Sequence, residues 1–335
     1  MVRPLTVISL FAGCGGSSLG YKLADFKELL AVEWDDNAVE TFRLNFPEIP
    51  IFHGDIAKLS DDECLKLANI KPSELDVLDG SPPCQGFSSV GKRRFADVRN
   101  TLFKEYVRLL KALQPKVFIM ENVKGLIQGS MKQIYIEIIR TLKECGYKVK
   151  SQLMNAMYFN VPQRRYRVII IGIREDLNIE PSHPRPKNNL ITLRKAFEGL
   201  EKDGTEIYYP NWLLKACKEI TRLETGPKTK LKAFIKYKGT KGGWINYCRL
   251  SWDYPSVTLC KTFISCAFLG HPDDQRFINA SECKRIGSFP DSFKFIGDFK
   301  QVVARIGNSV PPNMMRAIAE HVKENVLLKV GNEAQ

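Results

Sequence analysis

The chain has 335 residues, of which 44% are hydrophobic, and this is enough for one large domain or for a large and a small one. No apolar stretch is long enough to span a membrane, and nine cysteines without a CxxC pair argue against a disulfide framework or a cysteine-rich zinc site. With only four histidines, no metal centre is expected. The amino end shows no signal peptide, and the scattered cysteines suit a reducing compartment, so we expect a cytoplasmic protein.

The charge of the chain is unevenly distributed. The net charge is +13, yet residues 1–90 carry a net charge of −7. Residues 211–250 hold 10 Lys or Arg against 2 Asp or Glu. A basic block beside an acidic one is typical of a region that faces a polyanion, and nucleic acid is the expected partner. A solvated, lysine-rich surface is the alternative.

Strand and helix patterns alternate through the first half of the chain. The expected strands are Thr6–Leu10, Leu29–Glu33, Asp76–Asp79, Val117–Met120 and Arg167–Ile173. The expected helices end near Leu23, cover Asn100–Leu113, and run from a Ser130 cap to Gly146. This alternation predicts an α/β fold, with a doubly wound, mostly parallel, Rossmann-like sheet.

The pattern changes after Arg174. Residues 181–186 resemble a linker, and residues 190–250 are basic and poorly periodic. A last helix over Pro312–Leu328 carries apolar residues at helical spacing and is expected to return to the main core. We therefore expect a first domain over 1–176, a second region over 177–275, and a return segment over 276–335.

A glycine-rich turn follows the first expected strand. Phe11–Gly16 includes Gly13 and Gly15, which let the backbone turn tightly and approach a ligand. Glu33 lies 20 residues beyond Gly13, an offset at which an acid typically binds ribose hydroxyls. Trp34 could stack on an adenine, and Asp55 could accept its exocyclic amine. Together these residues predict an adenosine cofactor, although a glycine turn alone is common.

Cys84 follows another strand at a turn made by two prolines. Pro82 and Pro83 cannot extend a strand ladder, so the chain must leave the sheet there. Glu121 ends the next strand and should lie at the same sheet edge, which suggests a nucleophile beside a proton donor. The alternatives are a small buried cysteine and a solvated glutamate.

Two further blocks are polar or turn-like. Arg165 and Arg167 alternate onto one side of the chain and could bind an anion or brace Glu121, although a charged strand start would look the same. Gly307–Pro312 opens the last helix, where a simple capping turn is the alternative.

Taken in this order, these blocks resemble the DNA (cytosine-5) methyltransferases of the compact bacterial or phage type. The matching blocks are Phe11–Gly16, Glu33-Trp34, Gly54–Ile56, Pro82–Gln85, Glu121–Val123, Gln163–Arg167 and Gly307–Val310. Only about residues 177–250 carry no family motif. The resemblance implies an S-adenosylmethionine-dependent methyltransferase fold, with a target-recognition region in the basic block.

The resemblance also implies a mechanism. Cys84 would attack C6 of a cytosine flipped out of the duplex, and Glu121 would hydrogen-bond and protonate around N3. Arg165 would hold the base carbonyl and position Glu121. The C5 atom would take the methyl group of S-adenosyl-L-methionine, leaving S-adenosyl-L-homocysteine, and elimination would release the enzyme.

The remaining site residues follow from the same motifs. Residues expected to line the cofactor are Phe11, Gly13, Gly15, Glu33, Trp34, Asp55, Ile56, Pro83, Leu102, Asn308 and Val310. Residues expected to bind nucleic acid are Gln85, Ser88, Lys92, Arg93, Arg167 and Thr258. Gly86–Asn100 resembles a loop that closes over DNA, but Val90 departs from relatives that carry a small polar residue there.

The expected partner is double-stranded DNA. We expect a monomer that marks DNA, for example in a restriction-modification system with a separate restriction endonuclease. A tRNA methyltransferase of the same fold is the nearest alternative, but its Cys-Phe-Thr signature is absent. A silent binding module leaves Cys84 and Glu121 without a role, and a nicotinamide dehydrogenase leaves the Pro-Cys-Gln block unexplained.

Overall fold

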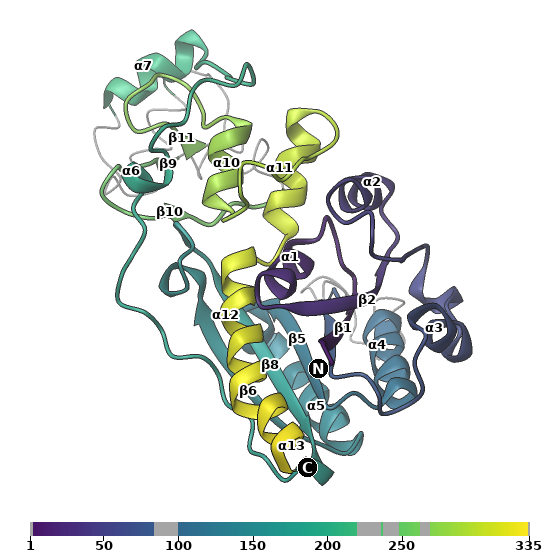
Figure 1. Cartoon of the computed structure of the whole chain (residues 1–335). Helices are drawn as coiled ribbons and strands as arrows, with labels where there is room; N and C mark the ends of the chain where they lie inside the picture. Colours follow the sequence, from purple (N-terminus) through teal and green to yellow (C-terminus); the bar gives the residue numbers. More distant parts are fainter. Residues whose placement is uncertain (1–2, 84–99, 220–235, 237–247, 262–268, 334–335) are drawn as a thin grey trace. The chain divides into compact units, whose positions relative to one another are not determined.

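The computed structural model describes residues 3–83, 100–219, 236, 248–261 and 269–333. The chain forms two compact units (Figure 1). The first unit comprises Met1–Phe159, Tyr166–Pro186 and Val310–Gln335, and the second comprises Asn160–Arg165 and Lys187–Ser309. None of the helices in the described ranges is long and apolar enough to cross a membrane.

The first unit is built on a seven-stranded sheet of order β3-β2-β1-β4-β5-β8-β6. Its strands are β1 (Leu5–Leu10), β2 (Phe26–Glu33), β3 (Ile51–His53), β4 (Val77–Gly80), β5 (Val117–Val123), β6 (Tyr147–Asn155) and β8 (Tyr166–Arg174). The first five strands are parallel, whereas β8 runs antiparallel to both β5 and β6. The predicted α/β class with a mostly parallel sheet is confirmed.

Helices cover both faces of this sheet, because its central strands are apolar on both sides. The helices of the first unit are α1 (Gly16–Leu23), α2 (Asp36–Asn45), α3 (Asp61–Ala68), α4 (Asn100–Leu113), α5 (Lys132–Glu144), α12 (Pro312–Val322) and α13 (Leu328–Glu333). Residues of α3, α4 and α5 share one buried cluster with β1, β4 and β5. Helices α1 and α12 lie side by side, and a Cβ on Gly20 would lie 2.6 Å from that of Met315 (Figure 1).

Most predicted elements occur near their predicted bounds, with two corrections. Ser130 does not cap α5: a short turn over Gly129–Met131 comes first, and the cap residue is Met131, without a side-chain bond. The last helix ends at Glu333 rather than at Leu328, since α12 continues through a π-helical segment over Lys323–Leu327 into α13. The other short turns of this unit are Ile56–Lys58, Lys124–Ile127, Ala156–Tyr158 and Glu175–Leu177.

The second unit contains mostly short elements. They are α6 (Leu193–Ala196), α7 (Asn211–Glu219), α10 (Ala280–Ile286), α11 (Phe299–Asn308), β7 (Gln163–Arg164), β9 (Cys248–Arg249), β10 (Ser256–Val257) and β11 (Leu269–Gly270). Strand β7 pairs with β10 and β9 with β11, both in parallel.

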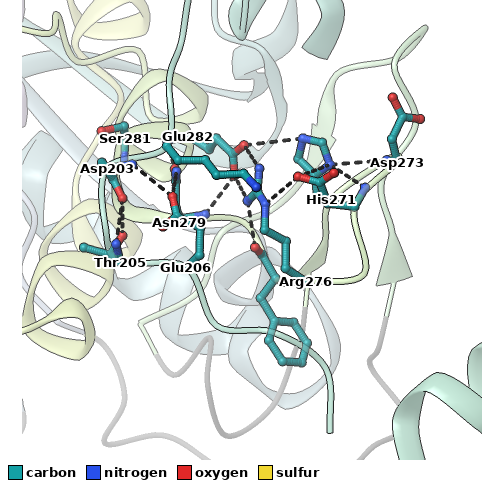
Figure 2. Close-up of polar contacts among 12 residues, drawn as sticks. Asp203, Thr205, Glu206, His271, Asp273, Arg276, Asn279, Ser281 and Glu282 are labelled. Carbon is teal, nitrogen blue, oxygen red and sulfur yellow. Dashed lines mark hydrogen bonds and ion pairs between the residues drawn. The ribbon is translucent and has the colours of Figure 1, made fainter. Parts of the chain in front are cut away.

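A polar network fixes the start of α10 within this unit (Figure 2). Both terminal nitrogens of Arg276 donate to the carboxylate of Glu282, at 2.9 and 2.8 Å, and both side chains are about 5% exposed or less. Asp203 accepts from the amide of Ser281 at 2.7 Å. A buried ion pair is tolerated only when its remaining polar atoms are also bonded. These bonds hold residues 276–286 in the second unit, whereas the sequence predicted that 276–335 completes the first domain.

Two carboxyl groups are buried in the first unit between β4, β2 and α1. Asp79 is 3% exposed and accepts from the hydroxyl of Tyr21 at 3.3 Å, and Glu28 is 8% exposed and accepts from the hydroxyl of Ser18 at 3.1 Å. Desolvation raises the pKa of Glu28 to about 7. Desolvation, helped by the negative charge of Glu28, raises the pKa of Asp79 to about 8. Both groups therefore bind protons more tightly in the folded chain than in the unfolded one.

This pair predicts a loss of stability at alkaline pH. Since the unfolded pKa values lie near ~4, folding takes up protons above that pH, and stability falls as the pH rises through about 7 and 8. Asp79→Asn and Glu28→Gln cannot ionise. At pH 9 we expect each variant to melt ~2–5 °C above the parent, and at pH 5 to show no such gain.

Thermal melts between pH 5 and 9 measure this effect. Glu48→Gln is the control, because the pKa of exposed Glu48 is lowered by Lys22, and its variant should not gain stability at pH 9. A parent protein whose melting temperature does not fall between pH 6 and 9 would contradict the assignment.

Candidate functional site

The glycine-rich turn and Glu33 form one hydrogen-bonded structure. The turn leaves β1 with positive φ angles at Phe11, Gly13 and Gly15, and a side chain at Gly15 would collide with the ring of Phe46. One oxygen of Glu33 accepts from the amide of Gly13 at 2.8 Å, and the other accepts from the amides of Trp34 and Asp35, both at 2.9 Å. A carboxylate has about four acceptor positions, so Glu33 can still accept from a ligand hydroxyl.

Trp34 and Asp55 lie at the ends of the neighbouring strands. Glu33 pairs with His53 in the β2–β3 ladder, and the amide of Gly54 donates to the carbonyl of Glu33 at 3.0 Å. The Trp34 side chain is 76% exposed, which is unusual for so large an apolar group. Asp55 is exposed and accepts from the amide of Ala57 at 3.0 Å. The sheet edge thus presents an acid, an open aromatic face and a second acid, a set that suits a nucleoside.

Other predicted cofactor residues differ in exposure. In the first unit, Ile56 and Val310 are buried, Pro83 is exposed, and Phe11 and Leu102 are partly buried against the core. In the second unit, Asn308 is exposed and ends α11.

Glu121 ends β5 in contact with a cation. The Oε1 atom of Glu121 lies 2.6 Å from Nε of Arg167, and only about 12% of either side chain is exposed. The β5–β8 register places Arg167 opposite Val123. Glu121 lies two residues before Val123 on the same face of β5, so the side chain of Arg167 can reach it. The Nε–H is not aimed at that oxygen, so the contact is an ion pair rather than an aligned hydrogen bond.

Asn122 connects this strand end to the proline turn. Its side-chain amide donates to the carbonyl of Pro82 at 3.1 Å, and its own oxygen accepts from the amide of Val123 at 2.9 Å. The β4–β5 ladder ends at Gly80 and Met120, so this bond continues the link between the two strands. Asn122 therefore ties the backbone two residues before Cys84 to the strand that carries Glu121.

Several predicted residues lie outside the described ranges. They are Cys84, Gln85, Ser88, Lys92 and Arg93. Most of the basic segment 211–250 and most of the predicted closing loop also lie outside them.

Arg165 and Thr258 lie in the second unit. Arg165 is 1% exposed and donates to the carbonyls of Leu259 at 2.9 Å and Gly307 at 2.7 Å. The hydroxyl of Thr258 donates to the carbonyl of Arg164 at 2.7 Å. Within the first unit, the arginine in ion-pair contact with Glu121 is Arg167, on the strand next to β5, and the role expected for Arg165 beside Glu121 stays a prediction. In the described ranges, no group of three or more His, Cys, Asp or Glu residues could hold a metal ion.

Nearly the whole chain matches one known protein family. A family model described as C-5 cytosine-specific DNA methylase matches residues 5–324, nearly the whole chain. The chain belongs to this family. The protein is therefore a DNA (cytosine-5) methyltransferase, and the resemblance first inferred from its motifs is confirmed.

Individual relatives of this methyltransferase cover most of its length. The type II methyltransferase M1.HphI of Haemophilus parahaemolyticus is 36% identical over 95% of this chain and 86% of its own length. M.Eco47II of Escherichia coli, also a type II methyltransferase, is 33% identical over 95% of this chain and 78% of its own length.

Solved structures agree on the fold of the methyltransferase. A structure described as a DNA modification methyltransferase encoded within an Escherichia coli prophage matches with a TM-score of 0.73 and 26% identity. That match covers 96% of this chain and 99% of the other. A DNMT2 variant of Spodoptera frugiperda matches with a TM-score of 0.69 at 20% identity, over 95% of this chain and 98% of the other, which supports the fold alone.

Three residues of this methyltransferase were underrated by reasoning from the sequence. Arg167 was assigned to nucleic acid rather than to Glu121, although its alternation with Arg165 made either arginine a candidate. Asn122 could have been recognised from its position directly after Glu121 at the strand end. Asp79 is an acid inside an otherwise apolar buried strand, a pattern that marks a buried polar site.

Proposed function

We propose that this methyltransferase modifies a cytosine within a short duplex DNA site, as the modification enzyme of a type II restriction-modification system. The observation that carries the proposal is the Glu121–Arg167 pair, joined by Asn122 to the proline turn that leads to Cys84. The type II relatives supply the biological role. A bacterial cytoplasm is the proposed location, since these relatives are bacterial.

The proposed chemistry begins at Cys84. Its thiolate forms a bond to C6 of the cytosine, which raises electron density at C5. Glu121 donates a proton at N3 of the ring, so the attack does not leave an uncompensated negative charge there. After methylation, solvent accepts the C5 proton, the N3 proton returns to Glu121, and departure of the thiolate restores the aromatic ring. The base must leave the duplex for these groups to reach it.

We assign to Arg167 the role that the sequence analysis gave to Arg165. Its guanidinium lies against Glu121, and this contact positions the carboxyl group. Its terminal nitrogens are hydrogen-bond donors in a fixed plane, which suits the carbonyl of the base.

S-adenosyl-L-methionine is the proposed methyl donor, and it supplies an electrophilic methyl group. The residues at the sheet edge suit it: Glu33 retains acceptor positions for ribose hydroxyls, Trp34 offers an open face for adenine, and Asp55 can accept an amine. Gly13 and Gly15 keep the turn free of side chains. The remaining proposed contacts are Phe11, Ile56, Pro83, Leu102, Asn308 and Val310.

The proposed DNA contacts come from two parts of the chain. Gln85, Ser88, Lys92 and Arg93 would contact the site around the flipped base, and Thr258 would lie near the backbone. The basic segment 211–250 would supply most of the attraction for phosphates. Recognition by one chain is proposed, with any restriction endonuclease acting separately.

A tritiated-methyl assay on duplex DNA and on tRNA tests the proposed substrate. We expect label in duplex DNA and none above background in tRNA, because the chain lacks the tRNA-type signature in its basic region. Bisulfite sequencing of DNA from expressing cells should then show one short methylated motif. Label that enters only tRNA would overturn the proposed substrate while leaving the cysteine chemistry intact.

A further inference from the structure

Both peptide groups of Leu259 are held by side chains of one short segment. The side-chain oxygen of Gln163 accepts from the amide of Leu259 at 3.1 Å. A terminal nitrogen of Arg165 donates to the carbonyl of Leu259 at 2.9 Å. Gln163 and Arg165 are two residues apart, so in an extended segment their side chains lie on the same side. Together they bond to both the amide and the carbonyl of Leu259.

The same two side chains reach further parts of the second unit. Arg165 also donates to the carbonyl of Gly307 at 2.7 Å, and the amide nitrogen of Gln163 donates to the carbonyl of Ile286 at 3.2 Å. Each side chain is only 1% exposed. A charged group buried this deeply is costly unless it is well bonded, so these bonds stabilise the buried segment.

The surrounding backbone leaves Thr258 and Leu259 little freedom. Strand β10 pairs with β7, and the hydroxyl of Thr258 donates to the carbonyl of Arg164 at 2.7 Å. A Cβ on Gly307 would lie 2.5 Å from the carbonyl carbon of Cys260, so the two backbones touch where Arg165 joins them. Because the single hydroxyl proton of Thr258 is used within the protein, this side chain is held in place rather than offering a free donor.

We propose that Gln163 and Arg165 are positioning residues that set the path of Thr258–Leu259 for DNA binding, and that Arg165 does not itself touch the target base. The inference rests on the proposed function, in which Thr258 lies near the DNA backbone. It gives Arg165 and Arg167 different tasks: Arg165 shapes the DNA-binding surface, and Arg167 serves the chemistry.

Steady-state kinetics on duplex DNA separate these tasks. Lysine can replace only part of the Arg165 fork, so we expect Arg165→Lys to raise KM for DNA about tenfold while kcat stays within about threefold. Thr258→Val should have the same pattern, and Thr258→Ser, which keeps the hydroxyl, should restore KM. In the double variant Arg165→Lys/Thr258→Val, the rise in KM should match the larger single effect to within about a factor of two, since both act on one segment.

Arg285→Lys is the matched control. Arg285 also bridges main-chain carbonyls in the second unit, those of Ala196 and Glu198, but it does not contact Thr258–Leu259. Its variant should lose thermal stability without raising KM for DNA. If Arg165→Lys does not fold, the variants Thr258→Val and Thr258→Ser still test the inference, because Thr258 is half-buried and carries no charge.

Three outcomes would overturn the inference. These are a fall in kcat with unchanged KM in Arg165→Lys, multiplicative effects in the double variant, and an unchanged KM in Thr258→Val. A wild-type protein that methylates no duplex DNA would instead overturn the proposed function, so the two failures are distinguishable.

Discussion

Cys84→Ser should abolish methyl transfer while the protein still binds duplex DNA. A serine hydroxyl is a far weaker nucleophile than a thiolate near neutral pH, so the bond to C6 does not form. We expect kcat to fall by about 10³-fold or more, with an unchanged melting temperature. Filter-binding or electrophoretic shift with duplex DNA should give a Kd within about threefold of the parent, since a single side-chain atom changes and no cationic side chain that could bind a phosphate is lost.

Cys145→Ser is the control for this variant. Cys145 ends α5 in the same unit, where its thiol donates to the carbonyl of Thr141 at 3.2 Å, and burial raises the pKa of this thiol. It lies outside the proposed site, and its variant should turn over at the parental rate. Undiminished methyl transfer by Cys84→Ser would rule out a covalent mechanism through Cys84.

The second large effect is expected at the Glu121–Arg167 pair. Glu121→Gln keeps the shape of the side chain but cannot deliver a proton, so kcat should fall by about 10²–10⁴-fold. Arg167→Lys keeps the charge but loses the planar fork, and we expect a fall of about 10²-fold in kcat with little change in KM. Single-turnover rates on duplex DNA measure the chemical step directly.

Comparison of the two arginines provides the control for this prediction. Arg165→Lys should act on KM, whereas Arg167→Lys should act on kcat. Equal losses of kcat in both variants would mean that both side chains serve the reaction, and the division between them would fail.

The sequence was sufficient to predict the sheet and most of the site edge. The strand expected at Arg167–Ile173 was predicted within one residue of each observed end. The strands expected at Leu29–Glu33 and Val117–Met120 are each three residues longer at one end. The helix Asn100–Leu113 was predicted at its observed bounds, because its apolar residues repeat at the helical period and Pro115 limits it. Edge strand β6 was missed, since Lys148, Lys150 and Gln152 interrupt its apolar pattern.

The division of roles between Arg165 and Arg167 could not be predicted from the sequence. Alternation places both side chains on one side of an extended segment, but the chain passes from the second unit to the first between Arg165 and Tyr166. The contact between Arg167 and Glu121 follows from the register of β5 and β8. The bond from Arg165 to Leu259 is a contact between segments far apart in the sequence. The cap predicted at Ser130 failed for a similar reason, because the preceding turn already fixes the start of α5.

The most direct test of the account is a trapping experiment with duplex DNA that contains 5-fluorocytosine. The fluorine cannot leave as the C5 proton does, so elimination is blocked and the enzyme stays attached after methyl transfer. With S-adenosyl-L-methionine present, we predict a stable protein–DNA adduct, and mass spectrometry of its peptides should place the linkage on the sulfur of Cys84. The absence of an adduct on DNA that the enzyme methylates in its unmodified form, or an adduct on another residue, would contradict the account.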